Sequence, residues 1–186
     1  MDWEATFRVV TAWTDRMERI MKISDRDKRK KSWDQHEQDE KVMKRAIVDE
    51  RDQWNDDLLA GRVGGKTGER IGQILIGLLL PAVRKVGEAG ERIDQTMRIT
   101  RLVFSLAAYH ADNKKYPTTL DALSPKYLAE IPSDLFSGKP LIYKPTETGY
   151  LLYSVGINEI DDGGKFYTDE DRGDDIGVRV PSVPKK

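Results

Sequence analysis

The chain has 186 residues, no cysteine, and a net charge of −1 although 34% of its residues are charged. This length allows one domain with a full hydrophobic core plus an appendage. The lack of cysteine excludes disulfides, thiolate-bound zinc and cysteine nucleophiles. The balanced charge gives no field that would attract a polyanion, so we expect no nucleic-acid partner.

Residues 1–65 are predicted to form a helical extension, either a helical hairpin or one long broken helix. Trp3 and Phe7 begin an apolar stripe at three- and four-residue spacing. The segment from Ser24 to Asp27 carries candidate N-caps for a second, more charged helix, in which His36 is expected to be solvated. If these helices do not fold back on the rest of the chain, a second copy or another protein must cover their apolar stripes.

The segment that reads GRVGGKTGER, Gly61 to Arg70, partly matches a phosphate-binding loop. The required first glycine would fall at Ala60, however, and no predicted strand precedes it. We therefore interpret this segment as a flexible linker.

A long helix is predicted over residues 67–113, with Pro81 either bending it or marking its true start. Its apolar stretch from Ile71 to Val83 is shorter than the roughly 18 residues that cross a bilayer. The first residues also lack the features of a signal peptide. We expect the chain as given to be soluble, with membrane attachment only through a segment absent from it.

After the long helix the pattern changes to short elements. Residues 114–136 are predicted to be a loop with a short helix capped by Thr118 or Thr119, and residues 137–181 a sheet with an acidic loop. The fold class is α+β, a long kinked helix packed on a small antiparallel sheet and preceded by the helical extension. The predicted strands are Leu141–Lys144, Gly149–Val155 and Asp175–Pro181.

Several short motifs follow one another in this region. Residues 116–134 contain Tyr-Pro, two leucines and a Tyr-Leu-x-x-Ile-Pro-x-Asp segment, and residues 138–156 contain Gly-x-Pro-x-x-Tyr followed by Tyr-x-x-x-Ser-x-Gly. In this order they resemble the soluble domain of type IV pilin-like proteins, most closely the major pseudopilin of type II secretion. Residues 74–93 are similar to the latter half of the pilin membrane helix, whereas the prepilin peptidase signature is absent.

The resemblance assigns a pseudopilin-like domain to residues 66–186. It implies a non-enzymatic structural or protein-interaction module that is related to secretion and acts in the cell envelope or another extracytoplasmic setting. The expected partner is another protein or a second copy, bound through the helical regions.

The segment from Ile157 to Ile176 contains eight acidic and two basic residues. Oxygen ligands without histidine or cysteine suit calcium better than zinc or copper, and a solvated acidic loop is the alternative. The resemblance also implies a calcium site here, closed by the Asp175-Ile176 pair, with Asn158 where the family usually has aspartate. The predicted ligands are Asn158, Asp161, Asp162, Asp174 and Asp175.

No catalytic residue is predicted, and no cofactor other than calcium. Ser154 lies in Tyr-Ser-Val-Gly, which is not a nucleophile elbow, and His110 is expected at the surface near a helix end. The alternative function is a hydrolase fragment or enzyme accessory domain with a cleft not evident in the sequence. Convergence of His110, Asp112 and Ser154 on a pocket would favour that alternative.

Overall fold

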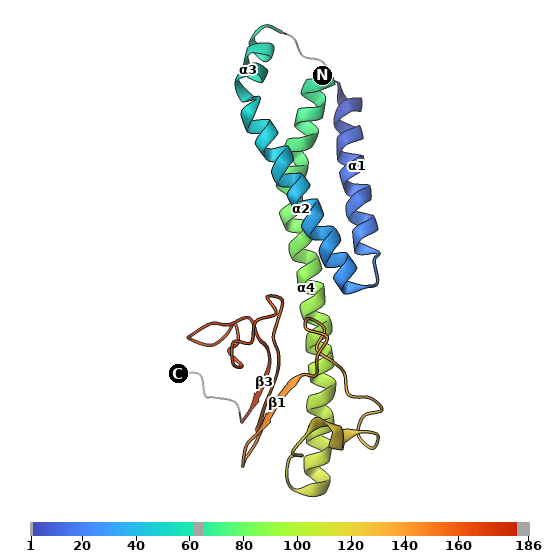
Figure 1. The fold of residues 1–186 in the computed structure, drawn as a ribbon, viewed down its shortest axis with the longest axis vertical. Coiled ribbons are helices and arrows are strands. Elements are labelled where there is room, and N and C mark those ends of the chain that lie inside the picture. Colours follow the sequence, from blue (N-terminus) through green and yellow to red (C-terminus); the bar gives the residue numbers. More distant parts are fainter. Residues whose placement is uncertain (1, 62–64, 182–186) are drawn as a thin grey trace. The chain divides into compact units, whose positions relative to one another are not determined.

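The computed structural model describes residues 2–61 and 65–181. The chain divides into two compact units, which we call the helical unit (residues 1–87) and the sheet unit (residues 88–186). The boundary between these units lies inside the longest helix, whereas the domain limit expected from the sequence lies at the start of that helix. In chain order the elements are α1 (Trp3–Met21), α2 (Arg26–Asp49), α3 (Arg51–Leu59), α4 (Gly65–Asn113), the 3₁₀ helix η1 (Leu120–Leu123), β1 (Ile142–Pro145), β2 (Tyr150–Ser154) and β3 (Ile176–Val180) (Figure 1).

In the helical unit, α1 and α2 form a hairpin (Figure 1). Each helix begins at an aspartate. The Asp2 side chain accepts a hydrogen bond from the Ala5 N–H at 3.1 Å, and the Asp25 side chain accepts one from the Lys28 N–H at 3.0 Å. These N-caps satisfy backbone donors that a helix start leaves free. Glu50 separates α2 from α3, so the second arm of the hairpin is broken.

Glycines near the start of α4 let α1 lie against it. A Cβ atom at Gly68 would lie 2.1 Å from the Asp2 carbonyl oxygen, and one at Gly72 would lie 2.9 Å from that of Thr6. The Thr6 hydroxyl donates a hydrogen bond to the Gly68 carbonyl at 2.8 Å. Close packing of α1 on α4 therefore gives a structural reason for Gly68 and Gly72. The prediction of a flexible linker is wrong for residues 65–70, which belong to α4, whereas residues 62–64 lie outside the described residues.

The helical unit has an apolar core of its own, to which α1, α2 and the first part of α4 contribute. The core residues of α4 recur at four-residue spacing, which places them on one face of the helix. Thus α1 and α2 fold back on residues 65–87. The buried core residues are Met17, Met43, Ile76 and Leu80, with Val10, Trp13, Trp33, Ile47 and Val83 packed around them.

His36 also lies on the inward face of α2, so the expectation that it is solvated is wrong. The residue is 1% exposed, and its ring centroid lies 4.7 Å from that of Trp13. The positions of Trp33, His36, Met43 and Ile47 follow the helical period. Charged residues between these positions hide that period in the sequence.

The long helix is confirmed, and it starts two residues earlier than predicted. Pro81 lies inside α4 rather than at its start, so the helix continues although proline cannot donate a backbone hydrogen bond. No helix in the described part of the chain combines the length and apolar character needed to cross a membrane.

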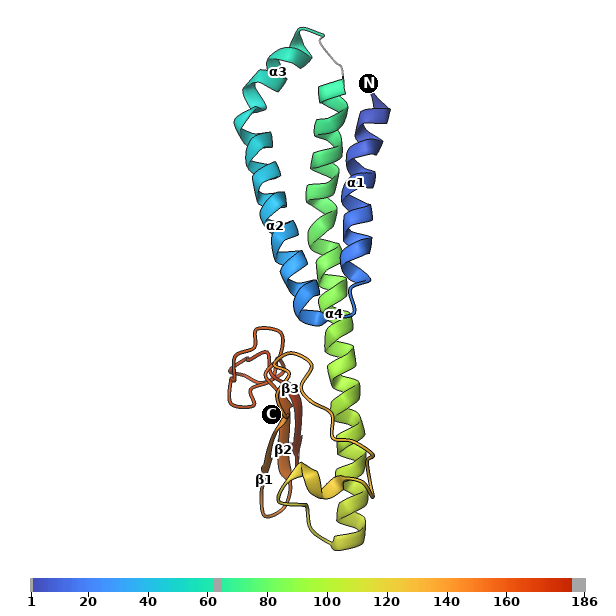
Figure 2. The same cartoon turned by 45° about the vertical axis from the view of Figure 1, so that its right-hand side comes forward.

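The sheet unit contains a three-stranded antiparallel sheet in the order β1-β2-β3. Leu152 of the central strand lies opposite Tyr143 on one side and Val178 on the other. Beyond residue 87, α4 packs on this sheet, which confirms the α+β fold class (Figure 2). The shared core comprises Ile99, Leu102, Leu106, Leu120, Leu123, Leu141, Tyr150 and Leu152.

The three predicted strands are confirmed, and each of their ends differs from the prediction by one residue. The predicted short helix is the single 3₁₀ turn η1. Thr119 is its N-cap but makes no side-chain hydrogen bond there, so the predicted capping bond is wrong. Because η1 is only four residues long, it has few free backbone donors to cap.

Candidate metal site in the acidic loop

The acidic loop, defined here as residues 155–175, connects β2 to β3, and the sheet holds its two ends together. Ser154 pairs with Ile176 across the two strands. Gly156 has a φ of +70°, and a Cβ atom there would lie 2.3 Å from the Asp174 carbonyl oxygen. Only glycine permits this conformation at so close an approach. The first and last residues of the loop therefore lie side by side.

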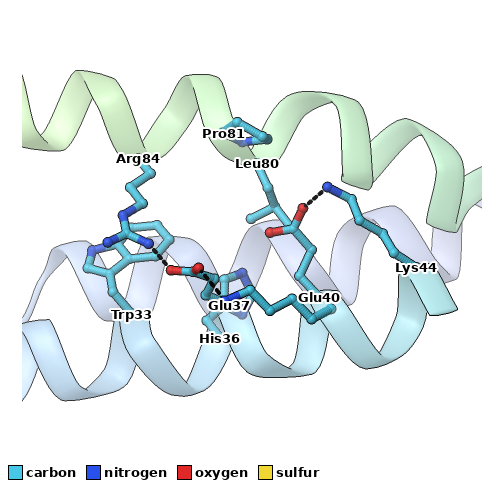
Figure 3. A pocket seen from close by; sticks show the side chains of 9 residues that line it. Trp33, His36, Glu37, Glu40, Lys44, Leu80, Pro81 and Arg84 are labelled. Atoms are coloured by element: carbon cyan, nitrogen blue, oxygen red, sulfur yellow. Dashed lines mark hydrogen bonds and ion pairs between the residues drawn. The ribbon is translucent and has the colours of Figure 1, made fainter.

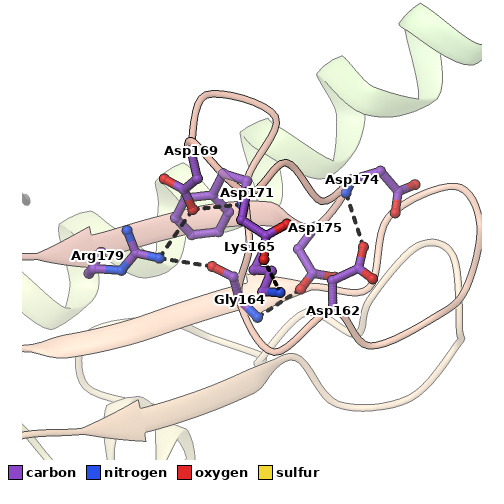
Figure 4. A network of polar contacts seen from close by, with 9 residues as sticks. Asp162, Gly164, Lys165, Asp169, Asp171, Asp174, Asp175 and Arg179 are labelled. Atoms are coloured by element: carbon purple, nitrogen blue, oxygen red, sulfur yellow. Dashed lines mark hydrogen bonds and ion pairs between the residues drawn. The ribbon is translucent and has the colours of Figure 1, made fainter. Parts of the chain in front are cut away.

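Basic side chains neutralise two acids in the outer part of the acidic loop (Figure 4). Lys165 forms an ion pair with Asp171 at 2.5 Å, and Arg179 of β3 contacts Asp169 at 3.4 Å. Arg179 also donates a hydrogen bond to the Gly164 carbonyl at 2.9 Å. These contacts fix the outer part of the loop, whereas no ion pair within residues 2–61 and 65–181 reaches the carboxylates of Asp162, Asp174 or Asp175 at its base.

Asp175 is the most buried acid of the loop, with 3% of its surface exposed. Its Oδ2 accepts a hydrogen bond from the Gly164 N–H at 2.8 Å, while its Oδ1 has no hydrogen-bond partner among the described residues. Burial raises the pKa of Asp175, and repulsion from Asp162 and Asp161 adds to the effect, whereas hydrogen bonds from the Gly164 and Asp162 backbones oppose it. A carboxylate in this position favours a bound proton or a nearby cation.

Asp162 and Asp174 complete the base of the loop. Asp162 Oδ2 accepts a hydrogen bond from the Asp174 N–H, and Asp174 Oδ2 accepts one from the Asn158 N–H, both at 3.1 Å. Asp174 Oδ1 is buried and, like Asp175 Oδ1, lacks a hydrogen-bond partner within residues 2–61 and 65–181. Three of the five predicted ligands, Asp162, Asp174 and Asp175, therefore lie at the base of the loop, but in the described structure their carboxylates are not arranged around a common point.

The other two predicted ligands use their side chains locally. Asn158 Oδ1 accepts a hydrogen bond from the Ile160 N–H at 2.7 Å. Asp161 Oδ1 accepts one from the Gly163 N–H at 2.8 Å and one from the Tyr153 hydroxyl at 3.0 Å. These oxygens shape the loop and are already engaged.

The donor atoms at the base of the loop suit a hard cation, because they are carboxylate oxygens. Within the described residues, no group of three or more aspartate, glutamate, histidine or cysteine side chains is arranged to hold a metal ion. The two buried oxygens without partners fit such an ion chemically. The carboxylates would have to converge for it to bind.

Asp134 is a structural anchor of this site that the sequence reasoning missed. It is 2% exposed, and its Oδ1 accepts hydrogen bonds from the Phe136 N–H at 3.0 Å and the Ser154 hydroxyl at 2.7 Å. Its Oδ2 accepts from the Ser137 hydroxyl at 2.9 Å and the Val155 N–H at 3.3 Å. Asp134 thus ties the preceding segment to the start of the acidic loop, and its place in the Ile-Pro-x-Asp motif is the only sequence signal for it.

The three residues whose convergence would indicate a catalytic cleft have separate partners. Ser154 is fully buried, Asp112 forms an ion pair with Lys126 at 2.7 Å, and the His110 ring stacks on Tyr116 at 4.5 Å. These contacts do not form a nucleophile and base pair.

The base of the acidic loop is therefore the candidate site, because two of its buried carboxylate oxygens lack hydrogen-bond partners in the described structure. Relatives add no information about it. Comparison of the chain with protein-family models, with curated proteins and with solved structures gave no match in any of the three.

Proposed function

We propose that this chain is a non-enzymatic, pseudopilin-like module with a structural or protein-interaction role, and that calcium stabilises its acidic loop. The observation that carries the proposal is the pair of buried oxygens, Asp174 Oδ1 and Asp175 Oδ1, without hydrogen-bond partners in the described part of the chain. A buried charge without compensation is strongly destabilising. A cation held by Asp162, Asp174 and Asp175 would remove that penalty.

Calcium suits this donor set better than the other common metals. It accepts six to eight oxygen ligands with flexible geometry, including backbone carbonyls and water, whereas magnesium requires near-ideal octahedral geometry. Zinc and copper sites are usually built from nitrogen and sulfur, which the side chains at the base of the loop do not supply. When bound, the ion would supply positive charge and fix the loop conformation.

A fully solvated acidic loop is the alternative interpretation. The ion pairs of Asp169 and Asp171 at the outer part of the loop are compatible with it. The burial of Asp175, which is 3% exposed, argues against a fully solvated loop, because this carboxylate has lost most of its contact with water.

The interaction role rests on the pseudopilin resemblance and on apolar side chains that the helical unit leaves exposed. Trp3 and Phe7 on α1 are 57% and 65% exposed, and Leu78 and Val86 on α4 are 72% and 73% exposed. We infer that these side chains contribute to the surface on which a partner binds. We place the interaction in the cell envelope or another extracytoplasmic setting, on the resemblance alone.

Calorimetry and thermal unfolding with calcium, magnesium or chelator test the ion site. At a calcium concentration of 100 times Kd, binding adds about 2.7 kcal/mol to the free energy of unfolding. For a unit of this size that raises Tm by about 11–22 °C. Magnesium should have a smaller effect.

Asp175→Asn should abolish the calcium heat and the rise in Tm. Asp171→Asn is the matched control, because Asp171 is paired with Lys165 away from the base of the loop, and it should keep both. No binding heat together with a Tm that chelator leaves unchanged would contradict the ion site. Equal losses in both variants would indicate a general effect of acidic charge.

A further inference from the structure

The helical unit contains a buried histidine that the proposed function does not use. His36 of α2 is 1% exposed, and its ring centroid lies 4.7 Å from that of Trp13 on α1 and 5.7 Å from that of Trp33. Neither ring nitrogen has a hydrogen-bond partner among the described residues, although a neutral imidazole offers one donor and one acceptor. This environment tolerates the ring only while it is uncharged.

A cavity of about 260 Å³ borders this histidine, between α2 and apolar residues of α4 (Figure 3). Glu37, on the cavity wall, forms ion pairs with Lys41 at 2.8 Å and with Arg84. Because Glu37 already has these cationic partners, it does not bond to the imidazole. Since His36 itself lines the cavity, a small movement of α2 would expose the ring to water.

Charged groups surround His36 on all three helices that pack there. Arg16 of α1 pairs with Asp39 of α2 at 2.6 Å, while Glu40 of α2 and Arg84 of α4 line the cavity. Burial lowers the pKa of His36, and the charge of Arg16 lowers it further, whereas Asp39 and Glu40 oppose the shift. An imidazolium would be attracted to the two indole rings, but it would also bury two N–H donors without acceptors, which is the larger effect.

We propose that His36 is a pH-sensitive latch: the neutral ring holds α2 against α1, and protonation drives the ring toward water and loosens α2. The latch and the acidic loop belong to different units, because His36 and its partners lie in the helical unit and the loop in the sheet unit. It gives the helical unit a structural response to mild acidification, within the range where histidine changes charge.

The direction of the pH effect follows from linkage. His36 has a lower pKa in the folded unit than in the unfolded chain, where the ordinary value is about 6.5. Its contribution to stability is therefore complete above about pH 6.5 and decreases as the pH falls toward the folded pKa. Between the two pKa values, each unit by which the pH falls raises the equilibrium constant of unfolding by up to about tenfold.

Amide hydrogen exchange of the full chain at several pH values between 7.5 and 5.0, corrected for the intrinsic rate, tests the latch. In the wild-type protein, α2 should lose up to about tenfold in protection per pH unit below pH 6.5. His36→Met, which keeps an apolar side chain of similar size, should give protection that does not change with pH. His110→Met is the matched control, because that histidine stacks on Tyr116 in the sheet unit, and it should respond like the wild type.

An NMR titration of the wild-type histidine rings keeps the test valid if His36→Met does not fold. The latch requires the His36 ring to titrate below 6.5, accompanied by changes in tryptophan fluorescence. A His36 ring that titrates at or above 6.5 would overturn the proposal. So would protection of α2 that depends on pH equally in the wild type and in His36→Met.

Discussion

Replacing Asp134 by asparagine should destabilise the sheet unit although the two side chains have nearly the same shape. The carboxylate accepts two hydrogen bonds on each oxygen, and each oxygen serves one backbone N–H, from Phe136 or Val155, and one hydroxyl, from Ser154 or Ser137. Asparagine has only one acceptor oxygen. In either orientation its NH₂ group faces a backbone N–H, while the hydroxyl beside it can rotate to accept.

The expected loss in the free energy of unfolding follows from the number of donors that asparagine leaves without an acceptor. One buried N–H left without a partner costs about 1–3 kcal/mol, and the remaining bonds lose their charge assistance, so we expect a loss of about 2–4 kcal/mol for Asp134→Asn. Asp134→Ala should lose more, because both backbone donors lose their acceptor. Ser137→Ala, which removes one hydroxyl donor and leaves three, should lose clearly less than Asp134→Asn, because the one N–H that the Ser137 hydroxyl accepts, from Lys139, is exposed and can bond to water.

Urea unfolding at neutral pH in chelator measures all three variants against the wild type, followed by near-UV circular dichroism. The tyrosines of the sheet core supply the signal. Asp134→Asn with wild-type stability would refute the account, because it would mean that the backbone donors find other acceptors.

The structure supports three further predictions. Leu106→Ala should lower the free energy of unfolding by about 2–5 kcal/mol, since Leu106 is fully buried between α4 and the sheet; the urea midpoint measures this. Gly156→Ala should lower the free energy of unfolding by at least about 1–3 kcal/mol and weaken calcium binding, because the new Cβ would lie 2.3 Å from the Asp174 carbonyl oxygen. Calorimetry measures the calcium affinity, and an unchanged affinity would contradict the second part of this prediction. Lys126→Ala should leave Tm unchanged, because its ion pair with Asp112 is exposed.

The elements of the fold could be predicted because their signals are local in the sequence. Alternation of apolar residues located the strands to within one residue at each end, and Asp25, in the predicted capping segment, is the N-cap of α2. Burial in the helical unit was harder to predict. His36 is surrounded in sequence by charged residues, and only the packing of α1 on α2 reveals that its position faces inward.

The candidate site could be predicted only in part, because composition identifies an acidic loop but not the direction of each side chain. Asn158 and Asp161 accept hydrogen bonds within the loop, which follows from turn geometry that single residues do not specify. The role of Asp134 depends on donors up to 21 positions away in the chain. No periodic pattern encodes contacts of that kind.

Two buried carboxylates in the sheet unit allow a direct test of where a cation is needed. Asp134 and Asp175 are 2% and 3% exposed, but Asp134 has four donors, whereas Asp175 has an oxygen without a hydrogen-bond partner in the described structure. In metal-free protein, removing the negative charge should therefore lower the free energy of unfolding at Asp134 and raise it at Asp175. Asp134→Asn removes a satisfied acceptor, while Asp175→Asn can keep an acceptor for Gly164 and removes repulsion.

The pH dependence of that difference is the decisive measurement. Asp175 has a raised pKa in the folded state, against about 3.9 in an unfolded chain. In chelator, its charge therefore destabilises the protein at neutral pH, and the penalty disappears as the pH falls through the folded pKa toward 3.9. Asp175→Asn should be more stable than the wild type at pH 7, and the two should converge on acidification. If the variant is instead less stable at pH 7, then Asp175 is already compensated within the folded chain and the argument for a calcium ion fails.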